Sequence, residues 1–282
     1  MNNLTTVSNS GRFEIINGKC AIPQGVTEIA DKEFCKVHEL REVVIPDSVI
    51  RIGEFAFDCT GLGEVKIPSG VKVIADGAFS DCFGLTRVEL PDTLVSIGEY
   101  GFSDCPLRSV ELPGSLVCIG RAAFAETDLV MVQIPASVIS IGRGAFAGCS
   151  RLESILVDEK NPMYRSVSDA CLTRDGETLV FGCMNSVIPD GVLFIAPNAF
   201  ESCTGLESVE FPNSVRTIQD AAFSCCRNLK AVKLPKSLTT IGREAFSNCE
   251  NLARPDIPTS VTTIGDKAFF IPEGDCGDEL PF

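Results

Sequence analysis

The 282-residue sequence contains a single histidine, His38. Nucleophilic catalysis needs a base beside the nucleophile, and no Gly-x-Ser-x-Gly motif marks a reactive serine. No Cys-x-x-Cys pair occurs, and one histidine cannot complete a Cys/His zinc set by sequence spacing. We therefore expect no enzyme activity, no cofactor and no metal site, and we interpret His38 as an exposed loop residue.

Long apolar runs and excess positive charge are also missing. No stretch of about eighteen apolar residues is present, and the opening Met1–Thr6 lacks the basic and apolar regions of a signal peptide. The 24 basic and 38 acidic residues give a net charge of -14, which repels phosphate backbones and anionic lipid surfaces. These features predict a chain that is not exported, does not insert into a membrane and does not bind nucleic acid.

The sequence does contain a repeat of 22 or 23 residues, in which a phenylalanine follows a proline by eleven positions. The prolines are Pro23, Pro46, Pro68, Pro91, Pro113, Pro135, Pro189, Pro212, Pro235 and Pro258. The phenylalanines are Phe34, Phe57, Phe79, Phe102, Phe124, Phe146, Phe200, Phe223, Phe246 and Phe269. Ten matching units of one fixed length predict a solenoid, in which each unit packs only on its neighbours.

A complete unit runs from Leu229 to Cys249 and shows what each position does. Its first six residues alternate as in a short strand, and the proline that follows ends the strand at the same point in every coil. The Ile-Gly pair, here Ile241-Gly242, places an apolar side chain inward and supplies a residue that can adopt positive φ. The phenylalanines should stack into a continuous spine behind one parallel sheet of about eleven short strands.

One interval of 54 residues, between Pro135 and Pro189, breaks the period. The segment 165–186 predicts a β-hairpin, because Asp175-Gly176 separates two apolar stretches. We expect this hairpin to project from one coil and to be dispensable for folding. Its large apolar residues Met163, Tyr164 and Phe181 either pack it against its coil, which we favour, or offer an anchor to a partner. Asn17-Gly18 predicts a second hairpin, which would cap the first sheet edge.

These signals divide the chain into three parts. Residues 1–10 are expected to be a flexible tail, and residues 271–282 an acidic tail. Residues 11–270 form a single solenoid, with the hairpin cap at about 11–22 and the hairpin island at about 158–186.

The unit Leu-x-x-Val-x-Ile-Pro-x-x-Val-x-x-Ile-Gly-x-x-Ala-Phe-x-x-Cys resembles the BspA-like class of leucine-rich repeats, also called the Treponema pallidum type. The likeness covers residues 11 to about 270, including the island at Asn161-Pro162-Met163-Tyr164. It implies an α/β-type repeat solenoid that is mainly β, a right-handed leucine-rich-repeat coil with an inserted β-hairpin. It also implies a bacterial surface or secreted protein that adheres to host proteins or cells. Location therefore stays open between the cell surface and the cytoplasm.

The fourteen cysteines mostly follow the repeat. Six lie three residues after a spine phenylalanine, namely Cys82, Cys105, Cys149, Cys203, Cys226 and Cys249, and Cys35 and Cys59 lie near that slot. A small, weakly polar side chain suits an interior position between coils, which predicts a ladder of free buried thiols. Cys171 and Cys183 are placed to pair across the predicted hairpin in an oxidising compartment.

The outward residues beside each central strand valine form the candidate binding surface. This candidate protein-binding face comprises Glu42, Val44, Glu64, Lys66, Arg87, Glu89, Arg108, Glu111, Met131, Gln133, Leu156, Glu210 and Lys233. We expect a monomer that binds a host extracellular or cell-surface protein through this face. Two alternatives stay open: a carboxylate-based hydrolase that uses face glutamates such as Glu64, Glu89, Glu111, Glu207 and Glu210, and a passive spacer in a larger surface assembly.

Overall fold

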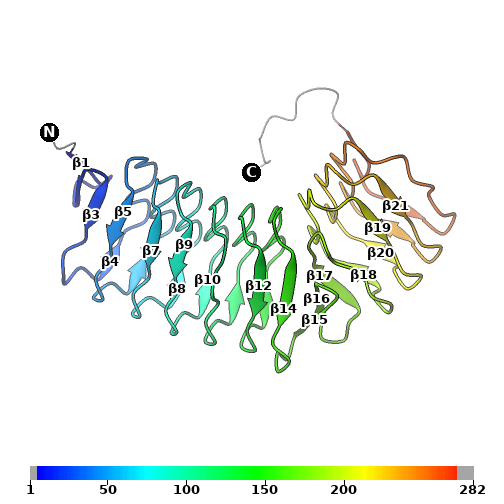
Figure 1. Ribbon diagram of the computed structural model, residues 1–282, viewed down its shortest axis with the longest axis horizontal. Helices are drawn as coiled ribbons and strands as arrows, with labels where there is room; N and C mark the ends of the chain where they lie inside the picture. The colour runs from blue at the N-terminus through cyan, green and yellow to red at the C-terminus, as the bar shows by residue number, and fades with distance from the viewer. Residues whose placement is uncertain (1–4, 272–282) are drawn as a thin grey trace.

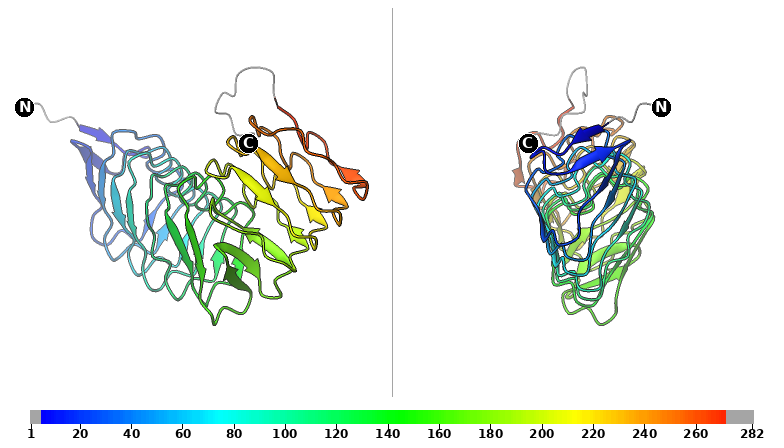
Figure 2. Two further views of the ribbon diagram at one scale, coloured as in Figure 1. Left: turned by 45° about the vertical axis from the view of Figure 1, so that its right-hand side comes forward. Right: turned by 90° about the vertical axis from the view of Figure 1, so that its left-hand side faces the viewer.

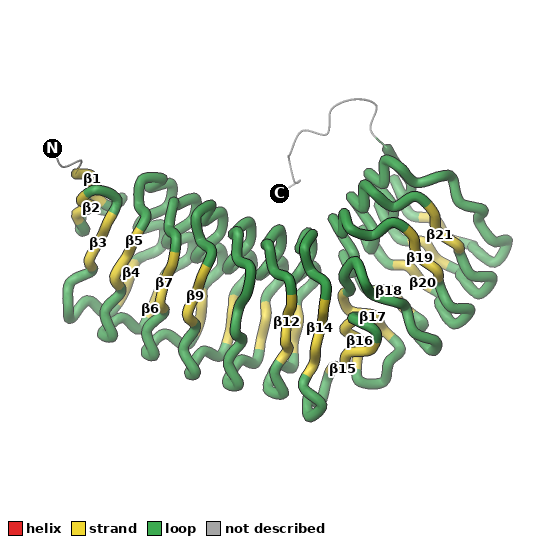
Figure 3. The backbone as a smooth tube through the Cα atoms, viewed as in Figure 1, coloured by secondary structure: helices red, strands yellow, loops and turns green. Residues whose placement is uncertain are grey.

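The computed structural model describes residues 5–271, which wind into a solenoid of about eleven coils (Figure 1). Short strands alternate with loops, and this part of the chain contains no helix (Figure 3). None of residues 5–271 therefore belongs to a helix long and apolar enough to cross a membrane. The predicted fold class, a mainly β leucine-rich-repeat solenoid with an inserted hairpin, is confirmed.

The strand that begins a repeat pairs in parallel with its counterpart in the next coil, except where the segment 107–112 or the island intervenes. We call this series the front row: β3 (Lys19–Ala21), β5 (Glu42–Val44), β7 (Glu64–Lys66), β9 (Arg87–Glu89), β12 (Met131–Ile134), β14 (Ser154–Val157), β19 (Ser208–Glu210) and β21 (Ala231–Lys233). The central residue of most of these strands is buried and its two neighbours are exposed. The proline after the strand ends it, as the sequence predicts.

A second set of strands, which the sequence does not predict, runs behind the first. This back row consists of β4 (Glu28–Ile29), β6 (Arg51–Ile52), β8 (Val73–Ile74), β10 (Ser96–Ile97), β11 (Cys118–Ile119), β13 (Ser140–Ile141), β18 (Phe194–Ile195), β20 (Thr217–Ile218), β22 (Thr240–Ile241) and β23 (Thr263–Ile264). Each strand ends at the isoleucine of the repeat, which glycine follows in six of the ten strands and alanine or glutamine in the other four. The expectation of one sheet of about eleven strands is therefore wrong in detail, because the backbone leading into the Ile-Gly pair is also extended and forms its own parallel ladder.

The phenylalanine turns close each coil. Ring centroids of successive phenylalanines lie 5.0 to 5.6 Å apart from Phe34 to Phe146, which confirms the predicted spine. Three backbone N–H groups per turn donate to the next coil, as Lys32, Phe34 and Lys36 do to Glu54, Ala56 and Asp58. The turns therefore form a hydrogen-bonded ladder of their own.

Glycine in the Ile-Gly pair serves close packing rather than positive φ. A Cβ atom on Gly142 would lie 2.4 Å from the backbone nitrogen of Arg121 in the preceding coil, and Gly142 has no positive φ. Positive φ instead occurs two residues before and two residues after the spine phenylalanine, as at Tyr100 (54°) and Asp104 (55°). The turn ladder imposes this conformation on ordinary side chains.

The island is a sheet of three strands: β15 (Tyr164–Val167), β16 (Ala170–Thr173) and β17 (Thr178–Phe181). The predicted Asp175-Gly176 hairpin joins β16 to β17, and β17 then pairs in parallel with β18. The ring of Phe181 lies 4.7 Å from that of Phe146 and Tyr164 is buried, so the predicted packing is correct for these two residues, whereas Met163 is exposed and does not pack. The island is nevertheless part of the core and does not project from it.

The solenoid bends at the island (Figures 1 and 2). The inserted strands interrupt both the front row and the back row. The turn ladder, in contrast, continues past the island, because the Gly148 N–H donates to the Glu201 carbonyl at 2.9 Å. The phenylalanine turns therefore lie on the inner side of the bend.

The N-terminal end is closed by antiparallel strands. Asn17 and Gly18 adopt positive φ and join β2 (Glu14–Ile16) to β3, as predicted. Residues 5–10, expected to be part of a flexible tail, instead form β1 (Thr5–Val7) and a turn, because the side chain of Asn9 donates to the carbonyls of Lys32 and Cys35. The acidic tail predicted at 271–282 lies, apart from Ile271, outside the described residues.

All thirteen cysteines within residues 5–271 are free thiols, including Cys171 and Cys183, which do not pair as the hairpin hypothesis allowed. The predicted ladder is present: Cys82, Cys105 and Cys249 are fully or almost fully buried. Their thiols donate to the carbonyl of the spine phenylalanine one coil earlier, at 3.0 to 3.2 Å. These hydrogen bonds give the buried phenylalanine carbonyls a partner in the next coil.

Candidate protein-binding face

The structure exposes every residue of the candidate face. The set is Glu42, Val44, Glu64, Lys66, Arg87, Glu89, Arg108, Glu111, Met131, Gln133, Leu156, Glu210 and Lys233, and each lies on the front row or in the loop that replaces one of its strands. They do not form one patch. Glu42 and Val44 lie near the N-terminal cap, and Glu210 and Lys233 lie beyond the island.

Opposite charges pair along most of this face. Glu64 lies beside Arg87 and Lys66 beside Glu89 in the ladder between β7 and β9. Arg87 also forms an ion pair with Glu89 at 2.8 Å, and Glu210 lies beside Lys233 further along. Exposed pairs of this kind contribute little stability, about 0.2–1 kcal/mol each, and one like-charged pair also occurs, because Glu42 lies beside Glu64 in the ladder between β5 and β7.

Apolar residues interrupt the charged pattern near the middle of the front row. Met131 on β12 is 50% exposed and Leu156 on β14 is 46% exposed. A hollow of about 880 Å³ lies beside Met131 and Gln133, and Arg108 and Glu111 line its other side. The register of β12 and β14 places Leu156 next to Gln133. The structure thus brings four of the predicted residues together around one hollow, and Leu156 lies on the next strand, outside its lining.

The hollow exists because one coil lacks its front strand. No hydrogen bond within residues 5–271 joins the segment 107–112 to β9, whereas Thr86 donates to the Gly63 carbonyl in the coil before. Pro106, which fixes φ and has no N–H, stands where Gly61 and Asp128 stand in the two other shortened coils. This break in the ladder leaves Val110 and Leu112 half-buried at the floor of the hollow.

A second hollow, which sequence reasoning missed, lies among the phenylalanine turns on the inner side of the bend. Its volume is about 320 Å³, and Glu126, Glu201, Arg121 and Arg143 line it. Partial burial and the charge of Asp104 raise the pKa of Glu126 to about 7, and burial also raises the pKa of Glu201. The signal was available, since acidic residues follow the spine phenylalanine by two positions in three consecutive units.

His38 is exposed in a loop, as predicted, and its Nδ1 atom lies 2.9 Å from the Cys59 carbonyl. No acidic side chain contacts the His38 ring among the described residues. The structure therefore places no charge relay around it.

The sequence matches the family model described as "BspA type Leucine rich repeat region", with six copies over residues 12–94, 72–172 and 182–271. These matches cover most of the chain. None of the curated proteins matches it.

Solved structures with the same architecture come from several bacteria. A leucine-rich repeat protein from Eubacterium ventriosum is 20% identical, with a TM-score of 0.64 over 100% of this chain and 98% of the other. A leucine rich cell surface protein from Faecalibacterium prausnitzii is 26% identical, with a TM-score of 0.62 over 95% and 84%. The pneumococcal vaccine antigen PcpA is 18% identical, with a TM-score of 0.64 over 94% and 70%.

Proposed function

Because the chain belongs to the BspA-type leucine-rich repeat family, whose repeats generally mediate protein–protein interaction, we propose that its front row binds a protein. The observation that carries this proposal is the hollow beside Met131, where apolar side chains are exposed in an otherwise charge-paired face. Binding energy concentrates where apolar side chains enter a pocket that excludes water.

The partner fills the hollow with a large apolar side chain and leaves the charge pairs at the rim. Met131 and Leu156 supply apolar contact, because both side chains are exposed in the free protein. Removing apolar surface from water on binding contributes about 25 cal/mol of free energy per Å². Arg108, Glu111 and Gln133 supply hydrogen-bonding groups around them. The charged side chains of β7 and β9 mainly orient the bound partner, since each lies beside an opposite charge within the face.

The partner we favour is an extracellular or cell-surface protein of a host, so that the function is adhesion. The support is the 26% identity to a protein described as a leucine rich cell surface protein. A net charge of -14 further favours partners with a basic surface, which long-range attraction draws toward the solenoid.

The test compares captured proteins between matched variants. Wild-type chain, a Met131→Lys/Leu156→Lys variant and an Ile50→Lys/Ile139→Lys control are immobilised and exposed to host extracellular matrix and to lysate of the producing cell. Ile50 and Ile139 are 62% and 49% exposed near the back row, so the control adds the same charge elsewhere. We expect a protein that binds wild type and control but binds the front-row variant at least about tenfold more weakly.

Equal binding of that protein to all three chains would place the interface on another surface. Absence of any captured protein would instead favour the passive spacer.

A second candidate function is a carboxylate-based hydrolase, and one observation favours it. The inner hollow brings Glu126 near Glu201, and burial raises the pKa of both carboxyl groups, as is typical of the acid in a carboxylate pair. Hydrolysis of a glycan or aryl glycoside that disappears in a Glu126→Gln variant would support this function over binding.

A further inference from the structure

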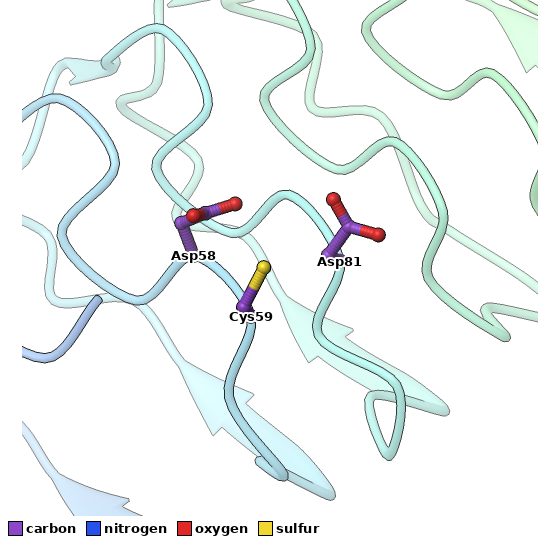
Figure 4. A group of neighbouring side chains, drawn as sticks. All are labelled: Asp58, Cys59 and Asp81. Atoms are coloured by element: carbon purple, nitrogen blue, oxygen red, sulfur yellow. The ribbon is translucent and has the colours of Figure 1, made fainter. Parts of the chain in front are cut away.

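One thiol and two carboxylates converge on the turn ladder of the N-terminal coils, and a second thiol lies beside one of these carboxylates. The Cys59 sulfur and the carboxylate oxygens of Asp58 and Asp81 all lie within 4.8 Å of one another (Figure 4). The thiol of Cys35, one coil earlier, lies 3.3 Å from Asp58 Oδ2. The four side chains come from three successive coils, and Figure 4 shows the Cys59 thiol lying between the two carboxylates.

We propose that Cys35, Asp58, Cys59 and Asp81 bind a borderline divalent cation of the zinc type. Thiolate and carboxylate are both ligands of Zn²⁺, and four such donors satisfy its tetrahedral preference. Ligand atoms on a tetrahedral zinc lie about 3.6 Å from one another at bond lengths of about 2.0–2.3 Å. The three atoms of the cluster therefore need to approach by about 1 Å, which rotation of side chains on a surface turn provides.

The thiols distinguish this cluster from ordinary acidic surface. Carboxylates alone would suit Mg²⁺ or Ca²⁺, whereas sulfur selects a softer ion. The positive charges of Lys32 and Lys36 act on the Cys35 thiol. The influences on Cys59 are burial and the negative groups around it, and together they raise its pKa to about 12. In the metal-free protein this thiol is protonated, and each thiol that binds the ion gives its proton to water.

The sequence does not predict this site, because its ligands do not occur at the short spacings of a Cys/His zinc set. In a solenoid, residues about 22 or 23 positions apart are direct neighbours, so Asp58 and Asp81 become adjacent although 23 positions separate them. The bound ion would link three coils at the N-terminal end of the turn ladder and would stabilise them by mass action.

The chain contains its own control. Cys225 occupies the same turn position as Cys59, two residues after a spine phenylalanine, with a φ of 58° against 54°. Its neighbours at the corresponding places are Ser224 and Asn248, and the Asn248 amide lies 3.5 Å from the Cys225 sulfur. The same backbone thus presents one thiol among carboxylates and one among neutral groups.

The experiment titrates the reduced, metal-free full chain with Co²⁺ and follows the thiolate-to-cobalt charge-transfer absorption, with Zn²⁺ as competitor. We expect the absorption in wild type and in Cys225→Ser, displacement by Zn²⁺, and a rise in thermal midpoint with Zn²⁺ concentration. Cys59→Ser should lose the absorption, and Asp81→Asn should weaken binding at least about tenfold. Circular dichroism checks that both variants fold.

Several outcomes would overturn the proposal. They are absence of the absorption in folded wild type, an unchanged signal in Cys59→Ser, an equal loss in Cys225→Ser, or stabilisation by Ca²⁺ as strong as that by Zn²⁺. The wild-type titration alone can therefore reject the site, even if a variant fails to fold.

Discussion

At the scale of single residues, the spine phenylalanines make the largest contribution to packing. The ring of Phe102 is fully buried between those of Phe79 and Phe124, at centroid distances of 5.3 and 5.6 Å. We expect Phe102→Ala to lower the free energy of unfolding by about 3–5 kcal/mol, because neighbouring coils cannot close the cavity. Urea titration measures the loss. Phe83→Ala, at a ring that is 52% exposed, is the control and should cost less than about 1 kcal/mol; similar losses in both variants would reject the spine.

Residue positions could be predicted from the sequence where a side chain has one role in every coil. The phenylalanine, the cysteine slot and the strand valine recur at fixed places, and their burial follows from that period. Positive φ at Ala122 and Glu244 could not be predicted, because neither residue type favours the left-handed region. There the hydrogen bonds of the turn ladder decide the conformation, and these depend on contacts between coils.

At the scale of elements, the island connects two cores. Along β16, Cys171 belongs to the hydrophobic cluster of the preceding coils, whereas Ala170 and Leu172 belong to that of the following coils. On β17, Phe181 belongs to the cluster of the preceding coils and Leu179 to that of the following coils. Both faces of the small sheet are therefore buried, which a projecting hairpin could not achieve. The sequence predicted the hairpin from Asp175-Gly176 but gave no sign of its second buried face.

Deleting residues 165–186 with a short Gly-Ser closure should consequently abolish cooperative thermal unfolding, which reverses the expectation from the sequence. The deletion removes Phe181 from the spine and exposes the apolar faces on either side. The matched control deletes residues 58–79, which is also 22 residues and one coil with both of its strands, β7 and β8, and should remain folded because equivalent surfaces then meet. Thermal unfolding followed by circular dichroism compares the two. A cooperative transition in the island deletion, equal to that of the control, would show that the island is dispensable.

The candidate protein-binding face could be predicted from the sequence only in part. Exposure of Met131 and Leu156 followed from their places beside the strand valines. The hollow could not be predicted, because it depends on the absence of a strand at 107–112. Pro106 indicates this break only once the pairing of the neighbouring strands is known. The inner hollow was missed for a similar reason, since Glu126 and Glu201 meet across the island.

At the scale of the whole molecule, the two hydrophobic clusters suggest two units of stability joined at the island. The first runs from Phe13 to Cys183 and the second from Ala170 to Ala268, and they overlap only within the island. Repeat proteins keep only nearest-neighbour contacts, so a local loss of stability spreads no further than the cooperative unit that contains it. The three-stranded sheet of the island can end such a cooperative unit because both of its faces are buried. Each face stays packed against its own core when the other core unfolds.

Hydrogen exchange followed by mass spectrometry tests this division. Phe223 is fully buried in the second cluster, and Phe223→Ala should cost about 3 kcal/mol or more. Amide exchange in residues 200–250 should then accelerate about 100-fold. Peptides before residue 146 should keep their wild-type rates, since their core ends on the near face of the island. The reciprocal variant, Phe79→Ala, should accelerate the early coils and leave residues 200–250 unchanged. Uniform acceleration along the whole chain in either variant would mean that the solenoid opens as one unit and that the island transmits, rather than limits, the loss of packing.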